Sequence, residues 1–394
     1  MYSPTRIAFV WLLFVTPACT SPGGPGARNP STVATASAAE TSLQVPRTVI
    51  TPTRGASVRE LFDEAASLLA AGQGAEAAAA FDRLVELDPD GELADQALFQ
   101  GALAHEQAGD RLISAARFEQ LARRFPESVL SRQALVRATR LFAYMEQWER
   151  TGAAADVLLK RHKKLTRIER LVAYGGKALS LVSSGDESSA QYFIEKGRHI
   201  IENARLDSAG KIPRDLAQIY FALGESRRLR GEAIDFDPMP EDFAKALEKR
   251  CQLLLDSQSA YSDTMRAYDS HWSAMAGFRV GELYTRLHHD VMKVPAPGSA
   301  TTNKKAQLFE GAMRLRYSIL LNKGLAMMTH TIGMAERTGE NSEWVERSRQ
   351  AKSAIERAVE AEKAAIDRLP YTRADLQRAL DDIGEKARRA ASKP

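Results

Sequence analysis

An internal repeat of 37 residues is the feature that most constrains the fold of this chain. At this offset the segment DPDGELADQALFQGALAHEQAGD at 88–110 matches FPESVLSRQALVRATRLFAYMEQ at 125–147. The same register aligns Leu61 with Leu98 and Leu135, Leu84 with Leu121 and Leu158, and Phe81 with Phe118. A fixed period of this length is typical of stacked two-helix units, because one unit alone cannot bury its apolar face.

Each unit reads as two helices joined by a short glycine turn and followed by a loop that contains proline. Gly72 and Gly109 share the turn position, and Pro89 and Pro126 share the loop position. Apolar residues recur at helical spacing, at Leu61, Ala65 and Leu68 on the first helix and at Ala77, Phe81 and Leu84 on the second. We therefore predict an all-α solenoid of helical hairpins, with each phenylalanine packed beside small alanines.

These positions resemble the signature of the tetratricopeptide repeat. The residues that carry the resemblance are Leu61, Ala65, Leu68, Ala77, Phe81, Leu84 and Pro89 in the first unit, and Leu98, Gly101, Ala102, Phe118, Leu121 and Pro126 in the second. The family repeats every 34 residues. The longer period here resembles the variant found in bacterial envelope proteins, such as the outer-membrane assembly lipoproteins and the coordinator associated with Tol-Pal. Weaker copies follow at 171–201, with Gly185-Asp186 as the turn, and at 215–231, so the predicted repeat array covers 57–234.

The pattern changes beyond residue 235, where long helices replace short ones. We predict helices over 243–293 with a break at Asp269-Ser270, and over 304–337, 342–368 and 373–390. These helices suit a C-terminal bundle or elongated repeats, and they define a predicted region at 235–394. The segment from Lys305 to Ala358 also resembles C-terminal regions of large repeat-containing lipoproteins from myxobacteria, including one tied to adventurous gliding motility.

The N-terminus has the features of an export signal. Arg6 is the only charge in the first 18 residues, and Ile7 to Val15 are nine consecutive apolar residues, too few to span a bilayer. Ala18 followed by Cys19 resembles the cleavage and lipidation site of bacterial lipoproteins, with 1–18 as signal peptide. An ordinary secretory signal cut near Ala18 is the alternative. Residues 19–56 are rich in Pro, Gly, Ser, Thr and Ala and read as a lipidated cysteine and a disordered tether. The residue after the cysteine is Thr20 rather than Asp, and the resemblance then implies the outer membrane.

Composition and motifs disfavour several classes of function. The formal charge is +4, and +3 without Arg6, which is too small to predict binding to nucleic acid. We find no HExxH, phosphate-binding loop, GxSxG or CxxC motif, and so predict no catalytic residue, metal site or cofactor. The motif at His288–Asp290 is read as an exposed helix end, because adjacent helical side chains diverge and cannot meet at one ion. Cys251 lies in a helical pattern and is predicted to be a small core residue.

One run of charge stands out, KRHKKLTRIER at 160–170, with six Lys or Arg against Glu169. Such a run is either a solvated face or a docking patch for an acidic protein or for lipid phosphate. Its candidate partner-binding residues are Lys160, Lys163 and Lys164. The second candidate surface is the concave face that the first helices of the repeats would form. Its candidates are Arg59, Asp63, Gln100, His105, Arg137 and Arg140.

Together these features predict a lipid-anchored, non-catalytic adaptor that faces the periplasm at the outer membrane. Its expected partners are envelope proteins, with the membrane contacted through the N-terminal anchor, and the resemblance favours a gliding-motility machine. The alternative is a factor for outer-membrane β-barrel assembly or Tol-Pal and cell-wall coordination, which binds extended protein segments. An enzyme of cell-wall metabolism is a third class, disfavoured by the missing motifs.

Overall fold

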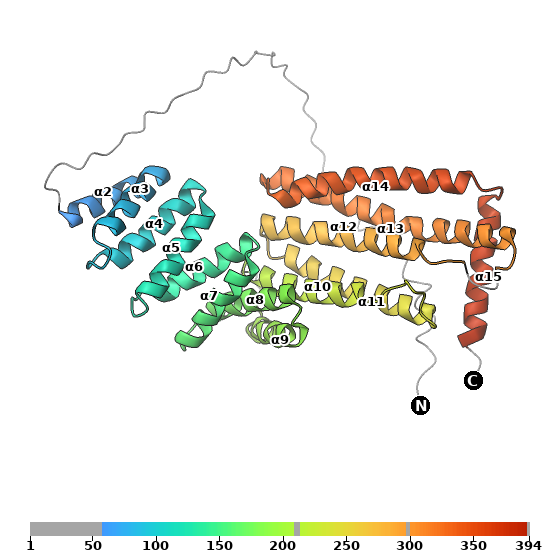
Figure 1. The fold of residues 1–394 in the computed structure, drawn as a ribbon, viewed down its shortest axis with the longest axis horizontal. Coiled ribbons are helices and arrows are strands. Elements are labelled where there is room, and N and C mark those ends of the chain that lie inside the picture. The colour runs from blue at the N-terminus through green and yellow to red at the C-terminus, as the bar shows by residue number, and fades with distance from the viewer. Residues whose placement is uncertain (1–56, 209–212, 297–299, 392–394) are drawn as a thin grey trace, which may run out of the picture. The chain divides into compact units, whose positions relative to one another are not determined.

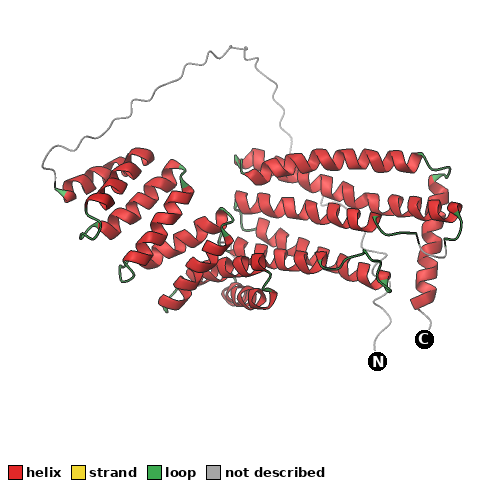
Figure 2. Ribbon diagram, in the orientation of Figure 1, coloured by secondary structure: helices red, strands yellow, loops and turns green. Residues whose placement is uncertain are grey.

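A computed structural model describes residues 57–208, 213–296 and 300–391, and within these ranges the chain forms fourteen α-helices and no strand (Figures 1 and 2). The first eight helices are α2 (Val58–Ala70), α3 (Gly74–Leu87), α4 (Ala94–Ala108), α5 (Arg111–Arg124), α6 (Ser131–Tyr144), α7 (Trp148–Arg161), α8 (Arg167–Ser184) and α9 (Glu187–Ala204). The others are α10 (Leu216–Glu232), α11 (Phe243–Met265), α12 (Ser270–Met292), α13 (Asn303–Thr338), α14 (Glu343–Asp367) and α15 (Arg373–Ala391). The predicted all-α class is confirmed. Cys19, the predicted signal peptide and the predicted tether lie outside the described residues.

The 37-residue repeat corresponds to the hairpins α2–α3, α4–α5 and α6–α7. Gly72 and Gly109 end the first helix of their hairpins with φ of 82° and 93°, a conformation that costs glycine nothing and other residues about 1–2 kcal/mol. This requirement explains the glycines of the repeat, and both turns are where the sequence predicts them.

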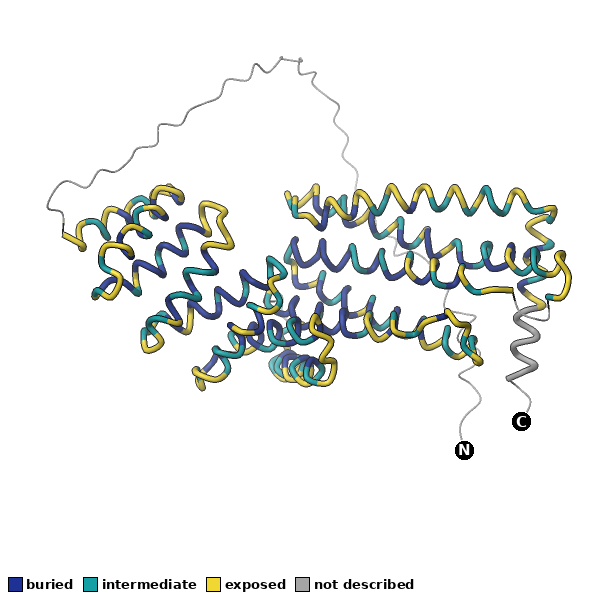
Figure 3. Tube along the Cα trace, viewed as in Figure 1, coloured by how far each residue is buried: buried dark blue, intermediate teal, exposed yellow. Residues whose placement is uncertain are grey.

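Repeat-related side chains fill the core between the helices. Phe81 and Phe118 are fully buried. Phe81 packs edge-to-face on Phe62, and Phe118 packs edge-to-face on Phe99, with ring centroids 5.5 and 5.3 Å apart. The two pairs are related by the 37-residue repeat. Small side chains recur at another fully buried position, Ala65, Ala102 and Thr139, where neighbouring helices approach closely. Figure 3 shows these buried stretches along the inner sides of the hairpins. The predicted register of the repeat is therefore confirmed in the core.

Two helices begin with a capping box, in which the first side chain and the carboxylate three residues later satisfy each other's free backbone N–H groups. At α2 the pair is Ser57 and Glu60, and at α8 it is Thr166 and Glu169. An N-cap of this kind stabilises a helix by about 1 kcal/mol. These caps set the first residue of the array and the first residue of its fourth hairpin, α8–α9, whose turn is at Gly185.

The fourth hairpin leads into a central helix, α10, that is covered on several sides. It packs on α8 and α9 and forms the next hairpin with α11. One cluster of buried side chains extends from Ala143 to Val345 and includes Phe221 of α10. The predicted domain boundary at residue 235 falls in the loop between α10 and α11, and it stays a prediction. The described residues after Ala56 form one compact unit.

The long C-terminal helices lie where the sequence predicts them, with the break between α11 and α12 at Asp269-Ser270. Helix α13 packs on α12, α14 and α15, and Figure 1 shows α15 crossing the direction of the other three. Cys251 is half-buried against this core, and burial raises the pKa of its thiol to about 11. The core role predicted for Cys251 is therefore confirmed.

Buried polar groups tie these long helices together. Glu225 of α10, 9% exposed, accepts hydrogen bonds from Arg228 and from Tyr261 of α11, and lies 3.1 Å from the guanidinium of Arg279 on α12. Burial alone would raise the pKa of Glu225, but Arg279 and Arg228 outweigh it, and the pKa is lowered. This carboxylate is therefore a charged part of the core.

The prediction of an exposed helix end at His288–Asp290 is wrong for His288. Its side chain is buried, at 7% exposed, and its Nε2 lies 3.8 Å from Glu362 of α14, because α12 is packed along its whole length. Among the described residues, no cluster of three His, Cys, Asp or Glu could hold a metal ion. In the same part of the chain no helix has the length and apolar character that a membrane span requires.

Candidate functional site

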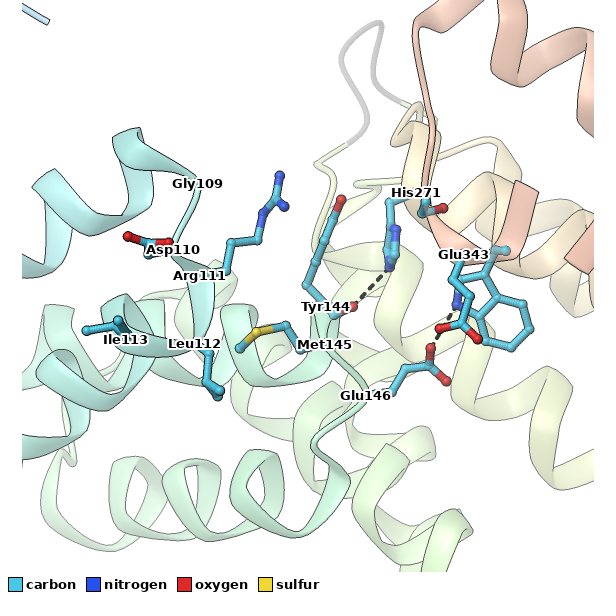
Figure 4. A pocket seen from close by; sticks show the side chains of 12 residues that line it. Gly109, Asp110, Arg111, Leu112, Ile113, Tyr144, Met145, Glu146, His271 and Glu343 are labelled. Carbon is cyan, nitrogen blue, oxygen red and sulfur yellow. Dashed lines mark hydrogen bonds between the residues drawn. The ribbon is translucent and has the colours of Figure 1, made fainter. Parts of the chain in front are cut away.

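A cleft of about 540 Å³ lies where the turns of the second and third hairpins meet the first residues of α12 and α14. Figure 4 shows its main residues. The lining side chains come from three places: Gly109, Asp110, Arg111, Leu112 and Ile113 at the start of α5; Tyr144, Met145 and Glu146 at the α6–α7 turn; and His271, Ser342, Glu343 and Trp344 from the C-terminal helices. Residues up to 235 positions apart in the sequence thus form one site.

Two of these residues depart from the surface pattern of the repeat. Leu112 and Ile113 are 51% and 45% exposed on the first turn of α5. The equivalent residues are Ala75 and Glu76 in the first unit, and Glu149 and Arg150 in the third. Exposed adjacent aliphatic side chains contribute little to the stability of a helix in water. Of the three units only the second has this aliphatic pair, and both of its side chains line the cleft.

Glu146 departs from the backbone pattern of the repeat. It follows Gly72 and Gly109 at the offset of 37, and it keeps their left-handed conformation, with φ of 57°, despite its side chain. Its carboxylate accepts a hydrogen bond of 2.8 Å from the indole Nε1 of Trp344, the first buried residue of α14. Burial raises the pKa of Glu146, and this hydrogen bond opposes part of the rise. The carboxylate is therefore held in an environment that disfavours its charge.

Trp344 forms the floor of this part of the cleft. It is 2% exposed and packs edge-to-face on Phe278 of α12, with ring centroids 5.3 Å apart. The guanidinium groups of Arg347 and Arg279 lie 4.6 and 5.1 Å from its ring centroid, within the range of a cation–π interaction. These contacts fix the indole, so its N–H is aimed at Glu146 before any ligand arrives.

The opposite part of the cleft is a stack of three side chains. The guanidinium of Arg111 lies 4.8 Å from the ring centroid of Tyr144, and His271 stacks on that ring at 3.7 Å. Figure 4 shows Tyr144 between the other two. Such a stack presents a flat, partly cationic surface beside the aliphatic pair Leu112 and Ile113.

His271 holds the C-terminal helices against the third hairpin. Its Nε2 lies 3.0 Å from the backbone carbonyl of Tyr144, and its Nδ1 lies 3.7 Å from the carboxylate of Glu340. Burial lowers the pKa of His271, so the ring is neutral at pH 7 and Nε2–H donates to the carbonyl. Burial would raise the pKa of Glu340, but hydrogen bonds from Ser342 and Ser270, together with His271, lower it. His271 therefore links α12 to the α6–α7 turn at one side of the cleft.

The residues predicted for the concave face are distributed differently from expectation. Arg59 and Asp63 are exposed on α2, and Gln100 is half-buried on α4. Arg137 pairs with Glu106 at 3.2 Å, and Arg140 holds both carboxylate oxygens of Asp215, just before α10, at 2.8 and 2.9 Å. Both arginines therefore join helices of the protein itself.

His105 is a correction, because an exposed contact residue was expected there. It is 7% exposed, and its Nε2 lies 3.0 Å from Asp82, which also pairs with Arg117 at 2.9 Å. The imidazole belongs to the packing between the first and second hairpins. Lys160, Lys163 and Lys164 are exposed, as a docking patch requires. None of the nine predicted residues from Arg59 to Lys164 lines the cleft.

The residues that build the cleft were missed at the sequence level, although a signal for three of them was present. In the 37-residue alignment, Glu146 replaces a glycine and Leu112-Ile113 replace Ala75-Glu76. The other partners, His271 and Trp344, have no such signal, since their contact with the third hairpin depends on how α12 and α14 pack.

No model of a known protein family matches this sequence, and no curated protein matches it. Tetratricopeptide repeat proteins are among the solved structures that this chain matches. One, from Parabacteroides merdae, has 11% identity and a TM-score of 0.39, with 76% of this chain and 100% of that chain covered. Another is the TPR2AB domain of yeast Sti1 in its complex with pHSP90, with 12% identity and a TM-score of 0.25, covering 79% of this chain and 98% of that chain.

Proposed function

We propose that this protein is a lipid-anchored, non-catalytic scaffold of the bacterial cell envelope, and that it holds a segment of a partner protein in the cleft between α5, α12 and α14. One observation carries the proposal: Leu112, Ile113 and Glu146 break the repeat that surrounds them, and all three line the same cleft. A purely structural array would keep the repeat at these positions, because each departure adds exposed apolar area or backbone strain.

The chemistry of the cleft suits a protein segment with apolar side chains. Leu112, Ile113 and Met145 offer apolar area, Tyr144 offers a flat ring, and Glu146 and Arg111 offer one acceptor and one donor group. Fully burying an aliphatic side chain contributes about 1.5–3 kcal/mol. A few polar groups around such an area select orientation, which is how most specific sites combine affinity with selectivity.

The anchor is proposed from the sequence around Cys19, which lies outside the described residues. Cys19→Ala should prevent lipidation and leave the protein uncleaved or in the soluble periplasmic fraction. Fractionation of cells, with mass spectrometry of the N-terminus, measures this outcome. The anchor is disproved if the variant matures normally and remains with the outer membrane.

The cleft is tested by restoring the repeat. The double variant Leu112→Ala with Ile113→Glu gives the second unit the residues of the first, so the helix should be kept while the apolar surface is lost. We expect proteins enriched from detergent-solubilised envelopes by the parent chain to be lost with this variant. For a captured protein purified on its own, affinity should fall at least about tenfold by calorimetry.

Leu87→Ala is the matched control, because Leu87 is also an exposed aliphatic residue, at 58%, but lies outside the cleft. Equal capture by the parent, the double variant and the control would refute the cleft as the docking site. Within the envelope we propose a gliding-motility machine, on the resemblance of the C-terminal segment. Motility proteins among those lost with the double variant support this assignment, and barrel-assembly or Tol-Pal proteins replace it with the alternative.

A further inference from the structure

A second surface feature is the basic loop, residues 160–170, which runs from the end of α7 to the first turn of α8. Its six cations are all exposed: Lys160, Arg161, Lys163, Lys164, Arg167 and Arg170. The only carboxylate of the loop, Glu169, caps the start of α8 and pairs with Arg132 at 3.4 Å. The loop therefore presents a strongly positive surface to solvent.

The basic loop is held in place by the protein around it. The guanidinium of Arg161 donates to the carbonyl of Ala122 at 2.9 Å, and that of Arg132 donates to the carbonyl of Lys164 at 3.3 Å. Leu165 anchors the centre of the loop in the core, at 8% exposed. Because the backbone is fixed, a ligand that meets the cations need not order the loop, which lowers the entropic cost of binding.

Two of the six cations, Arg167 and Arg170, lie where positive charge does not favour a helix. Arg167 lies in the first turn of α8 and Arg170 follows it, near the positive end of the helix dipole, where acidic side chains are preferred. The pKa of His162 is lowered mainly by burial, and the charges of Arg132 and Arg161 lower it further. Lys160 and Arg161, in contrast, lie in the last turn of α7, where cations are favoured, so helix stability leaves only Arg167 and Arg170 unexplained.

An apolar side chain lies beside this charge. Val129 is 92% exposed, more than any other large hydrophobic residue in the described part of the chain, and belongs to the preceding inter-repeat loop. That loop is adjacent to the basic loop, because Arg132, three residues after Val129, contacts both Lys164 and Glu169. Cations around an exposed apolar side chain match the interface of a bilayer, where phosphates lie outside the acyl chains.

We propose that the basic loop, with Val129 beside it, docks on the anionic headgroups of the membrane in which the chain is anchored. Each Lys or Arg near an anionic surface strengthens binding, and several together act within a Debye length of it. The setting rests on the proposed lipid anchor, which would hold the folded unit near such a surface. An acidic protein would also match the charge, but it gives no reason for the solvent-exposed valine.

The proposal is tested with the chain from residue 19 onward carrying Cys19→Ser, so that no lipid anchor contributes. Co-sedimentation is measured with phosphatidylcholine vesicles that contain or lack phosphatidylglycerol. We expect binding only when phosphatidylglycerol is present. The triple variant Lys160→Gln, Lys163→Gln and Lys164→Gln should lower partitioning about a hundredfold and reduce its salt dependence. Val129→Ser should weaken binding by up to about tenfold without changing the salt dependence.

The matched control is Lys245→Gln, Lys249→Gln and Lys305→Gln, which removes the same charge from other exposed lysines. The control should bind as the parent does, and circular dichroism should be the same for all variants. Three results would overturn the proposal: no preference for anionic vesicles, an equal loss in the control, or unchanged vesicle binding by the triple variant. If in the last case the triple variant also loses a captured envelope protein, the basic loop serves an acidic protein. Cleft capture is measured separately, so either proposal can fail alone.

Discussion

At the scale of single residues, Glu146 shows how a repeat acquires a specific contact. Its backbone conformation costs about 1–2 kcal/mol relative to the glycine found at the same position in the first two units. The hydrogen bond from Trp344 offsets part of this cost, and the carboxylate is placed in the cleft as a result. Backbone strain of this kind is typically found at functional sites.

Replacing Glu146 with glutamine should change how stability depends on pH. Burial raises the pKa of Glu146 in the native state above the usual value of about 4.3, which applies to the unfolded state. Between the unfolded-state pKa and the native-state pKa, the native state therefore binds more protons than the unfolded state. The free energy of unfolding of the parent should therefore fall, relative to Glu146→Gln, as pH rises through this window. Urea unfolding at several pH values measures the difference.

Glu149→Gln is the control for this experiment, since Glu149 is an exposed carboxylate on the first turn of the next helix. The control should follow the parent at every pH. Parallel curves for the parent and Glu146→Gln would show that the Glu146 carboxylate is solvated like an ordinary surface group, against the burial described here.

At the scale of elements, the first two hairpins of the repeat are each organised by an aromatic pair. Phe81 packs on Phe62, and Phe118 packs on Phe99 in the next unit, at nearly the same distance. The third unit has Ala155 at the equivalent of Phe118, also fully buried, so the pair is absent there. The third hairpin instead contacts α10, α12 and α14 through Arg140, Tyr144 and Glu146.

Replacing Phe81 or Phe118 with alanine should lower the free energy of unfolding by about 3–5 kcal/mol, the usual cost of a buried phenylalanine. The two variants should cost similar amounts, since the rings occupy equivalent sites. Chemical denaturation followed by circular dichroism measures the loss. A cost below about half a kcal/mol for either residue would mean that the ring is solvent-exposed and the repeat register is shifted.

Most elements could be predicted from the sequence, because their signals are local. Glycine turns, apolar spacing and breaks such as Asp269-Ser270 locate the helices within a few residues. The burial of His105 and the pairing of Arg140 with Asp215 could not be predicted in the same way. Both depend on contacts between hairpins, 23 and 75 residues apart, and helical spacing does not contain that information. The cleft is of the same kind, since its residues come from 109–146 and 271–344, which are far apart in the sequence.

At the scale of the whole molecule, the predicted division at residue 235 can be tested with fragments. Helix α10 buries Phe221 against Tyr261 of α11 and Trp272 of α12, so a fragment of residues 57–234 would expose this surface. We expect that fragment to bind a hydrophobic dye and to melt over a broad range, while the chain from 57 to 394 melts sharply. Calorimetry and dye fluorescence measure both properties. Sharp melting of 57–234 and 235–394 as separate fragments would establish two independent domains instead.

The attachment of the third hairpin has a mechanical consequence. Among the described helices, the extensive packing of α2 to α5 is with one another and with α6. The third hairpin, in contrast, contacts Asp215 before α10 through Arg140, and α12 and α14 through Tyr144 and Glu146. The first two hairpins are therefore joined to the other described helices mainly through the third hairpin, and the cleft lies at that junction. A segment bound there would contact both sides of the junction and would thereby set the angle between the first two hairpins and the C-terminal helices.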